Sequence, residues 1–157
     1  MVGTAVHWES CKQLEFNHAD KWYEHKPESV LENEKSQLLW DFEVQTDHHI
    51  EARRPDLIIV DKEKKTCQIV DFAIPGDHRV EMKEREKREK YQDLARELQV
   101  LWNKKVTVIP IVIGALGTVP KSLKSRLDQI GIRTKIETMQ TTALLNTARI
   151  VRKVLEL

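Results

Sequence analysis

The stretch that decides the fold is "RRPDLIIVDKEKKTCQIVDFAIPGD", residues 53–77. Two apolar runs flank the charged segment "DKEKKT", a pattern typical of two strands joined by a turn. Pro75 and Gly76 end the second strand, because both residues are strong breakers of regular structure. Each run also carries an aspartate, Asp56 or Asp71, although an ionised carboxylate is costly to bury in a sheet. The stretch therefore predicts a hairpin with one acid in each strand.

The register of this hairpin determines how close the two acids lie. A turn centred between Glu63 and Lys64 pairs Asp56 with Asp71, because both are equally far from that centre. Directly opposed residues have Cβ atoms about 4.5–5.5 Å apart on one face, so one carboxyl takes up a proton or a cation lies between them. Carboxylates at this spacing suit Mg²⁺ or Mn²⁺. The alternative is a register shifted by one residue, or a strand end near solvent at Asp56.

The segments outside this stretch predict an α/β fold. Periodicity and breakers indicate helices over 3–16, 79–102, 120–131 and 141–157, and strands over 37–46, with one solvated face, and 106–117. Residues 17–36 are expected to be an irregular connection with a short helix after Pro27. The sheet should then have four strands, three antiparallel and the fourth parallel to the third across a crossover helix. The length fits one domain, 1–157, with its core over about 37–115 and C-terminal helices over about 120–157.

The long helix after the hairpin is expected to bring a basic group to the acids. Its inner stripe runs from Leu94 through Tyr91 to Lys87, where it changes from apolar to basic. At about 3.3 Å per strand residue and about 1.5 Å per helix residue, Lys87 and Asp71 come to similar heights along the sheet. Lys90 is turned partly away, toward a DNA backbone. A lysine beside two metal-binding acids is typical of phosphodiester hydrolysis, where the metal generates hydroxide and the ammonium stabilises developing charge.

Four motifs together resemble a known family of nuclease domains. "RRPD", fourteen intervening residues, "DFAIPGD" and then "KREKY" are similar to the restriction-like endonuclease domain of site-specific non-LTR retrotransposons, a variant of the PD-(D/E)XK fold. The stretches "WDFEVQTD", "VIPIVIGALG" and "TALLNTARIVRKVLEL" extend the resemblance over most of the chain. The resemblance implies a restriction-endonuclease-like fold at the C-terminal end of a reverse-transcriptase reading frame. It also implies a domain that nicks double-stranded target DNA for target-primed reverse transcription.

The resemblance assigns roles to individual residues. Asp56 and Asp71 match the two metal-binding acids of the family, and Lys87, Lys90 and Tyr91 match its K-x-x-K-Y motif. The general pattern has its lysine two residues after the second acid, where this chain has alanine. In the retrotransposon domains that lysine function resides on the following helix, which agrees with the stripe described above.

Further ligands and DNA contacts are less sharply indicated. The family often uses another acid, for which the candidates are Asp47 in "QTD", Glu9 in the first helix, and Glu34 if a helix follows Pro27. The candidate DNA contacts are Lys90, Arg54, Lys121 and Lys124. His7 and Cys11 have the spacing of half a zinc site, but a packing role in the helix is favoured because no second pair has ligand spacing.

Composition limits the partners and the compartment. With 26 basic and 25 acidic residues the net charge is +1, so DNA binding must come from local clusters. Two cysteines are too few for a disulfide framework, and no signal peptide or membrane span is apparent, so we expect an intracellular, reducing compartment, the nucleus rather than the cytoplasm. The reverse transcriptase and zinc knuckle normally fused to such a domain are expected elsewhere. The alternative function is a catalytically inactive DNA-binding or protein-interaction remnant.

Overall fold

The computed structural model describes residues 2–131 of the 157-residue chain. The elements in chain order are α1 (Val2–Gln13), η1 (Trp22–Glu24), β1 (Val30–Glu32), β2 (Ser36–Trp40), β3 (Leu57–Asp61), β4 (Thr66–Ala73), η2 (Asp77–Arg79), α2 (Val80–Lys90), α3 (Gln92–Leu101), β5 (Lys105–Val112) and α4 (Leu123–Gln129). The helix predicted over 141–157 lies outside the described residues. Within residues 2–131, every helix is too short or too polar to cross a membrane.

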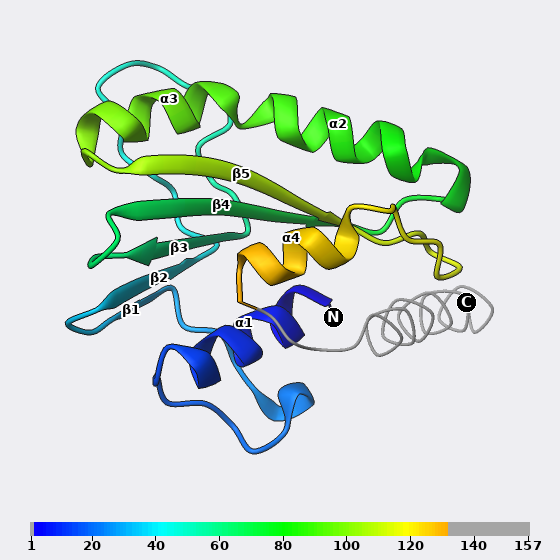
Figure 1. Ribbon diagram of the computed structural model, residues 1–157, viewed down its shortest axis with the longest axis horizontal. Coiled ribbons are helices and arrows are strands. Elements are labelled where there is room, and N and C mark those ends of the chain that lie inside the picture. Colours follow the sequence, from blue (N-terminus) through cyan, green and yellow to red (C-terminus); the bar gives the residue numbers. More distant parts are fainter. Residues whose placement is uncertain (1, 132–157) are drawn as a thin grey trace, which may run out of the picture.

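The strands form one mixed sheet in the order β1-β2-β3-β4-β5. Neighbouring strands are antiparallel from β1 to β4, and β4 and β5 are parallel. This arrangement confirms the predicted α/β class and the parallel last pair. The crossover between β4 and β5 consists of α2 and α3, which run end to end along one side of the sheet (Figure 1).

The sheet has five strands, and the prediction of four missed β1. β1 contains only three residues, two of them exposed, so it carries no alternating apolar signal. The turn that joins β1 to β2 depends on Asn33, whose side-chain oxygen accepts hydrogen bonds from the amides of Lys35 and Ser36. The segment after Pro27 is therefore a strand at the sheet edge, and the predicted short helix there was wrong.

β2 is shorter than predicted and is buried on both faces. It ends at Trp40, and the next residue, Asp41, has a left-handed φ of 48°. Leu38 and Leu39 are consecutive and both buried, one packing in the cluster with α1 and the other in the cluster with α3. The expected solvated face is covered because helices lie on both sides of the sheet.

Two apolar clusters divide the core between the faces of the sheet. One cluster joins α1 and α4 to the sheet through Val6, Leu123 and Leu127. The other joins α3 to the opposite face through Leu94 and Leu98. The result is a three-layer arrangement with α1 and α4 on one side of the sheet and α2 and α3 on the other (Figure 1).

The helix predicted over 79–102 is two helices that meet at Tyr91. This residue has a ψ of 9° and separates α2 from α3, while its ring is buried in the cluster with α3. Neither glycine nor proline marks the break, so the sequence carries no local signal for it. The break lies one turn beyond Lys87, at the level where the helix passes the acids of the hairpin.

Candidate functional site

The hairpin has the predicted register. Leu57 pairs with Val70 and Ile58 pairs with Ile69, so Asp56 and Asp71 are the next opposed residues beyond the paired part of β3. Ile58 and Ile69 belong to the cluster beneath α3. Side chains two residues apart on a strand share a face, so the two acids also point toward the α2 and α3 side.

Each of the two carboxylates accepts a hydrogen bond from a backbone amide of the opposite side of the hairpin. The Asp56 amide donates to Asp71 Oδ1 at 2.9 Å, and the Phe72 amide donates to Asp56 Oδ2 at 2.8 Å. These side-chain hydrogen bonds extend the pairing of the two strands to Asp56 and Asp71, one residue before β3 begins at Leu57. Asp71 is only 4% exposed, and Asp56 is half-buried. Each acid is thus fixed by a partner on the neighbouring strand, which gives its burial a structural basis.

Lys87 closes the site from the helix side. Its Nζ donates to Asp71 Oδ2 at 2.5 Å, and its side chain is 17% exposed. Such a short bond between an ammonium and a carboxylate is of the charge-assisted kind. The structure therefore brings together Asp56, Asp71 and Lys87, and it does so at the height that strand and helix rises predicted.

Burial shifts the protonation equilibria of two groups in the site. Desolvation raises the pKa of the Asp56 carboxyl to about 6, and the neighbouring Asp71 adds to the rise while the Phe72 amide and Lys87 oppose it. Burial also raises the pKa of the Tyr91 hydroxyl, with further contributions from Asp71 and Asp56. Tyr91 therefore stays protonated and serves as a donor beside the acids.

The donor set fits a hard divalent cation. Among the described residues, Asp56 Oδ1 is the carboxylate oxygen of the pair that accepts no backbone or lysine hydrogen bond. A carboxyl with raised proton affinity in a half-buried position favours a cation in place of the proton. Mg²⁺ commonly takes one or two carboxylates and completes its shell with waters and phosphate oxygens. Asp56 and Asp71 have the chemistry for such a site.

The candidate third acids lie apart from this pair. Glu9 is on α1, where its carboxylate lies 3.8 Å from Lys12 Nζ. The Asp47 amide lies 3.3 Å from Glu97 of α3. Among residues 2–131, no third acidic, histidine or cysteine side chain joins Asp56 and Asp71 in a group close enough to share one ion.

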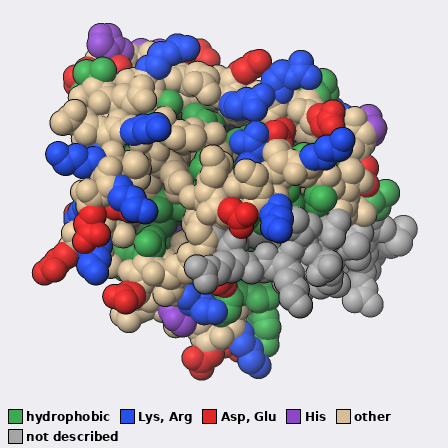
Figure 2. Space-filling view, viewed as in Figure 1, with side chains coloured by type: hydrophobic (Ala, Val, Ile, Leu, Met, Phe, Trp, Pro, Cys, Tyr) green, Lys and Arg blue, Asp and Glu red, His purple; other side chains and the backbone are tan. Residues whose placement is uncertain are grey.

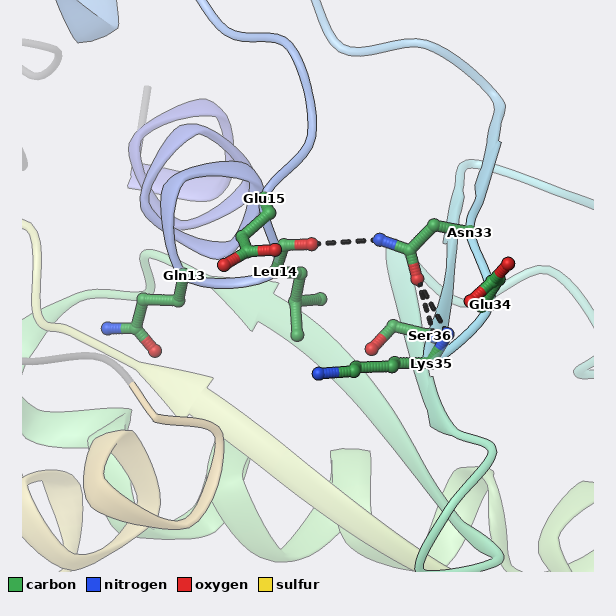
Figure 3. Close-up of a pocket in the computed structure, with 7 residues that line it drawn as sticks. All are labelled: Gln13, Leu14, Glu15, Asn33, Glu34, Lys35 and Ser36. Atoms are coloured by element: carbon green, nitrogen blue, oxygen red, sulfur yellow. Dashed lines mark hydrogen bonds between the residues drawn. The ribbon is translucent and has the colours of Figure 1, made fainter.

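Glu34 lies in the turn between β1 and β2, at the edge of a different pocket. This pocket, of about 460 Å³, lies between the end of α1 and that turn (Figure 3). The Asn33 side chain donates to the Leu14 carbonyl at 2.9 Å across it. The pocket is thus a gap between two connections, and Glu34 is a residue of its rim.

The candidate DNA contacts are exposed on several elements. Arg54 makes a two-pronged ion pair with Asp41, at 2.9 and 3.2 Å. Lys90 is exposed at the end of α2, with its Nζ 5.2 Å from the centroid of the Tyr91 ring. Lys121 and Lys124 are exposed at the start of α4. On the face shown in Figure 2, basic side chains are interspersed with acidic ones.

Two structural supports of the site were missed by sequence reasoning. Asp77 accepts hydrogen bonds from the Leu116 amide, at 2.8 Å, and from the Thr118 hydroxyl, and so holds the loop after β5 against the end of β4. Gly114 is required there, because a Cβ on it would lie 2.2 Å from Asp77 Oδ1. The sequence "IPGD" predicts a break after β4, but it does not reveal which loop the aspartate contacts.

The second support is an ion pair that joins the two helical layers. Arg126 of α4 donates to Glu84 of α2 at 2.9 Å, and the two side chains are 14% and 13% exposed. Ser122 donates to the other Glu84 oxygen at 2.9 Å. Glu84 lies one turn before Lys87, so this network fixes the part of α2 that carries the lysine. Only three-dimensional structure reveals it, because the partners are far apart in sequence.

Comparison with known proteins adds no family assignment. A scan against protein-family models found no match, and a search of curated proteins found none either.

Proposed function

We propose that this chain is a Mg²⁺- or Mn²⁺-dependent endonuclease domain with a restriction-endonuclease-like fold, which nicks double-stranded DNA. The observation that carries the proposal is the constellation of Asp56, Asp71 and Lys87. Two acids locked in register at the start of a hairpin face a lysine from the crossover helix at 2.5 Å. This is the arrangement that the retrotransposon motifs imply, with the lysine on the helix and Ala73 on the strand.

The chain's own groups have separate tasks in such a reaction. Asp56 and Asp71 would hold a divalent cation, which would supply charge neutralisation and activation of the attacking water. The Lys87 ammonium donates a hydrogen bond to a phosphoryl oxygen, on which charge develops in the transition state. Tyr91 remains a neutral donor beside Asp71, because burial raises the pKa of its hydroxyl. Lys90, exposed at the end of α2, contacts the DNA backbone.

The biological role that follows from the resemblance is target-primed reverse transcription. A nick leaves a 3′ end from which a fused reverse transcriptase begins synthesis, so the proposed partners are double-stranded DNA and that polymerase. The restriction-endonuclease-like fold and the nuclear location belong to the same proposal.

A second candidate is a DNA-binding or protein-interaction module without catalysis. It is favoured by one feature, the Lys87–Asp71 ion pair, which neutralises the buried acid in the absence of any metal. An ion pair of this kind stabilises a fold whether or not the site has activity.

A plasmid-nicking assay with Mg²⁺, Mn²⁺ or EDTA separates the two candidates. The nuclease proposal requires nicking that depends on divalent metal and is lost in Asp56→Asn. Calorimetry measures the binding of Mg²⁺ to both proteins. Asp93→Asn is the matched control, because Asp93 is an exposed acid on α3 that pairs only with Arg96. The non-catalytic module would be established if the chain binds DNA but does not nick it with any of the metals, and if the wild type and Asp56→Asn bind DNA equally well.

A further inference from the structure

A second group of ligating side chains lies on the other face of the sheet, between α1 and the segment after η1. His7 Nδ1 and His25 Nε2 are 2.7 Å apart, and Cys11 Sγ lies 3.6 Å from the first and 3.9 Å from the second. His7 and Cys11 are fully buried, and His25 is 9% exposed. The sequence indicated the spacing of His7 and Cys11, but His25 was missed because thirteen residues lie between it and Cys11.

The three ligating atoms have nearly the spacing of one face of a tetrahedral zinc site. Zinc bonds of about 2.0–2.1 Å to nitrogen and about 2.3 Å to sulfur place two nitrogens about 3.3 Å apart and a nitrogen and a sulfur about 3.6 Å apart. The two observed sulfur–nitrogen distances are close to this value, and the nitrogen–nitrogen distance is shorter by less than about 1 Å. Two imidazoles and a thiolate are ligands that suit zinc and disfavour Mg²⁺.

We propose that His7 Nδ1, Cys11 Sγ and His25 Nε2 bind one zinc ion, which fastens the segment after η1 to α1. The fourth position faces a pocket of about 230 Å³ that both histidines line. His18 and Glu28 also line this pocket, so the candidates for the fourth ligand are His18, Glu28 and a water molecule. On binding, the Cys11 thiol releases its proton to solvent, and both histidines coordinate through a neutral nitrogen.

The facing atoms of the group are buried lone-pair donors that can bind a cation in place of the hydrogen bond between the two rings. Of the described residues, His7 Nε2 and Ser10 Oγ are also buried without a hydrogen-bond partner, and both are non-ligating atoms in the proposed site. The short contact between His7 Nδ1 and His25 Nε2 is too close for two protonated rings, because both nitrogens would then be donors. Between the end of α1 at Gln13 and His25 the chain has only the η1 turn as regular structure, so an ion there would add a fixed link between the two segments.

The test begins with the wild-type chain stripped of metal by a chelator and titrated with Zn²⁺ and, in parallel, with Co²⁺. We expect one zinc per chain by elemental analysis, a Co²⁺–thiolate charge-transfer absorption, and a higher melting temperature with zinc. Cys11→Ser should abolish the charge-transfer band and lower zinc affinity by more than about 100-fold, because loss of even an outer partner of a ligand costs about 10–100-fold. Cys67→Ser is the matched control, since Cys67 is equally buried and lies in the other cluster.

Independent variants keep the outcome clear if one of them folds poorly. Lowered affinity in Glu28→Gln or in His18→Asn identifies the fourth ligand, and unchanged affinity in both identifies water. Lys87→Ala should retain zinc, so failure of the nuclease proposal leaves this site untouched. A wild-type chain that shows no Co²⁺–thiolate band and binds no zinc, with its circular dichroism intact after stripping, would overturn the proposal.

Discussion

At the scale of single residues, the structure explains how a sheet keeps two acids in its interior. The Asp71 carboxylate accepts hydrogen bonds from a backbone amide and from the Lys87 ammonium, and the Asp56 carboxylate accepts one from a backbone amide. The cost of desolvation is thus divided unequally, because Asp71 has a counter-charge and Asp56 carries the raised pKa. This asymmetry makes the two acids respond differently to substitution.

Asp71→Asn should destabilise the metal-free protein by about 2–4 kcal/mol, because it removes the hydrogen-bonded counter-charge of the largely buried Lys87. From the sequence alone, the same change is expected to relieve a repulsion and be neutral or stabilising, and the ion pair reverses that expectation. Urea unfolding of Asp71→Asn measures the cost, with Asp93→Asn as the exposed control. Equal stabilities of Asp71→Asn and the wild type would show that Lys87 is fully solvated when its partner is lost.

Asp56→Asn should change how stability depends on pH. The pKa of Asp56 in the folded state, about 6, lies above its ordinary value of 3.8, so the folded state binds more protons between these two pH values. The wild type therefore loses stability relative to Asp56→Asn as pH rises from about 4 to about 7, by about 1–2 kcal/mol after allowance for solvent screening. Chemical denaturation across this range without divalent metal tests the difference, and parallel curves for the two proteins would contradict it.

Lys87→Ala should lower the single-turnover nicking rate by about 10²–10³ with little change in DNA affinity, as for loss of one charge-stabilising donor. Lys83→Ala is the control on the same helix, because Lys83 pairs with Glu86 on the exposed side. Lys87→Arg keeps the charge and should restore part of the rate. Wild-type cleavage by Lys87→Ala would mean that the catalytic lysine lies elsewhere.

At the scale of elements, the sequence predicted what local pattern determines. The hairpin register followed from the charged turn at Glu63 and Lys64, and the parallel last strand followed from the crossover between two apolar runs. β1 was missed because three mostly exposed residues carry no periodic signal. The break at Tyr91 was missed because neither glycine nor proline marks it in the sequence. His25 was missed because an irregular connection places it beside His7 and Cys11, and local sequence pattern does not reveal the path of such a connection.

The Glu84–Arg126 pair between α2 and α4 should be worth more than an ordinary surface ion pair. Arg126→Met should cost about 2–3 kcal/mol, because it leaves Glu84 as a nearly buried charge with only the Ser122 hydroxyl. The double variant Glu84→Gln with Arg126→Met should lose less than the sum of the single losses. A double-mutant cycle by thermal unfolding measures the coupling. Lys83→Met, which breaks an exposed pair, should stay within about 0.5 kcal/mol of the wild type.

At the scale of the whole molecule, charge balance governs how DNA binding depends on salt. The net charge is +1, and basic and acidic side chains are interspersed over the face shown in Figure 2. Long-range steering of the proposed DNA partner should therefore be weak, and its affinity should depend on a few local phosphate contacts. The helices α2 and α3 lie over the acids, and the end of α2 carries exposed basic side chains.

Lys90→Ala should weaken DNA binding similarly for different sequences and reduce the slope of log affinity against log salt by about one phosphate contact. Fluorescence anisotropy at several salt concentrations measures the slope. Lys64→Ala is the control, because this exposed lysine lies in the hairpin turn at the far end of β3 and β4 from the acids. An unchanged slope for Lys90→Ala would place the DNA on another surface.

Because its lysine comes from a helix, the site should make the tolerance to natural substitutions vary along α2 with the periodicity of a helix. Under the proposed function, selection acts on the rotation of α2 as much as on Lys87 itself, so intolerant positions should recur every three or four residues at Val80, Glu84, Lys87 and Tyr91. The intervening solvent-facing positions should vary more freely. A lysine carried by a strand would instead constrain every second residue, and this chain has alanine, Ala73, at the strand position where the general nuclease pattern has lysine.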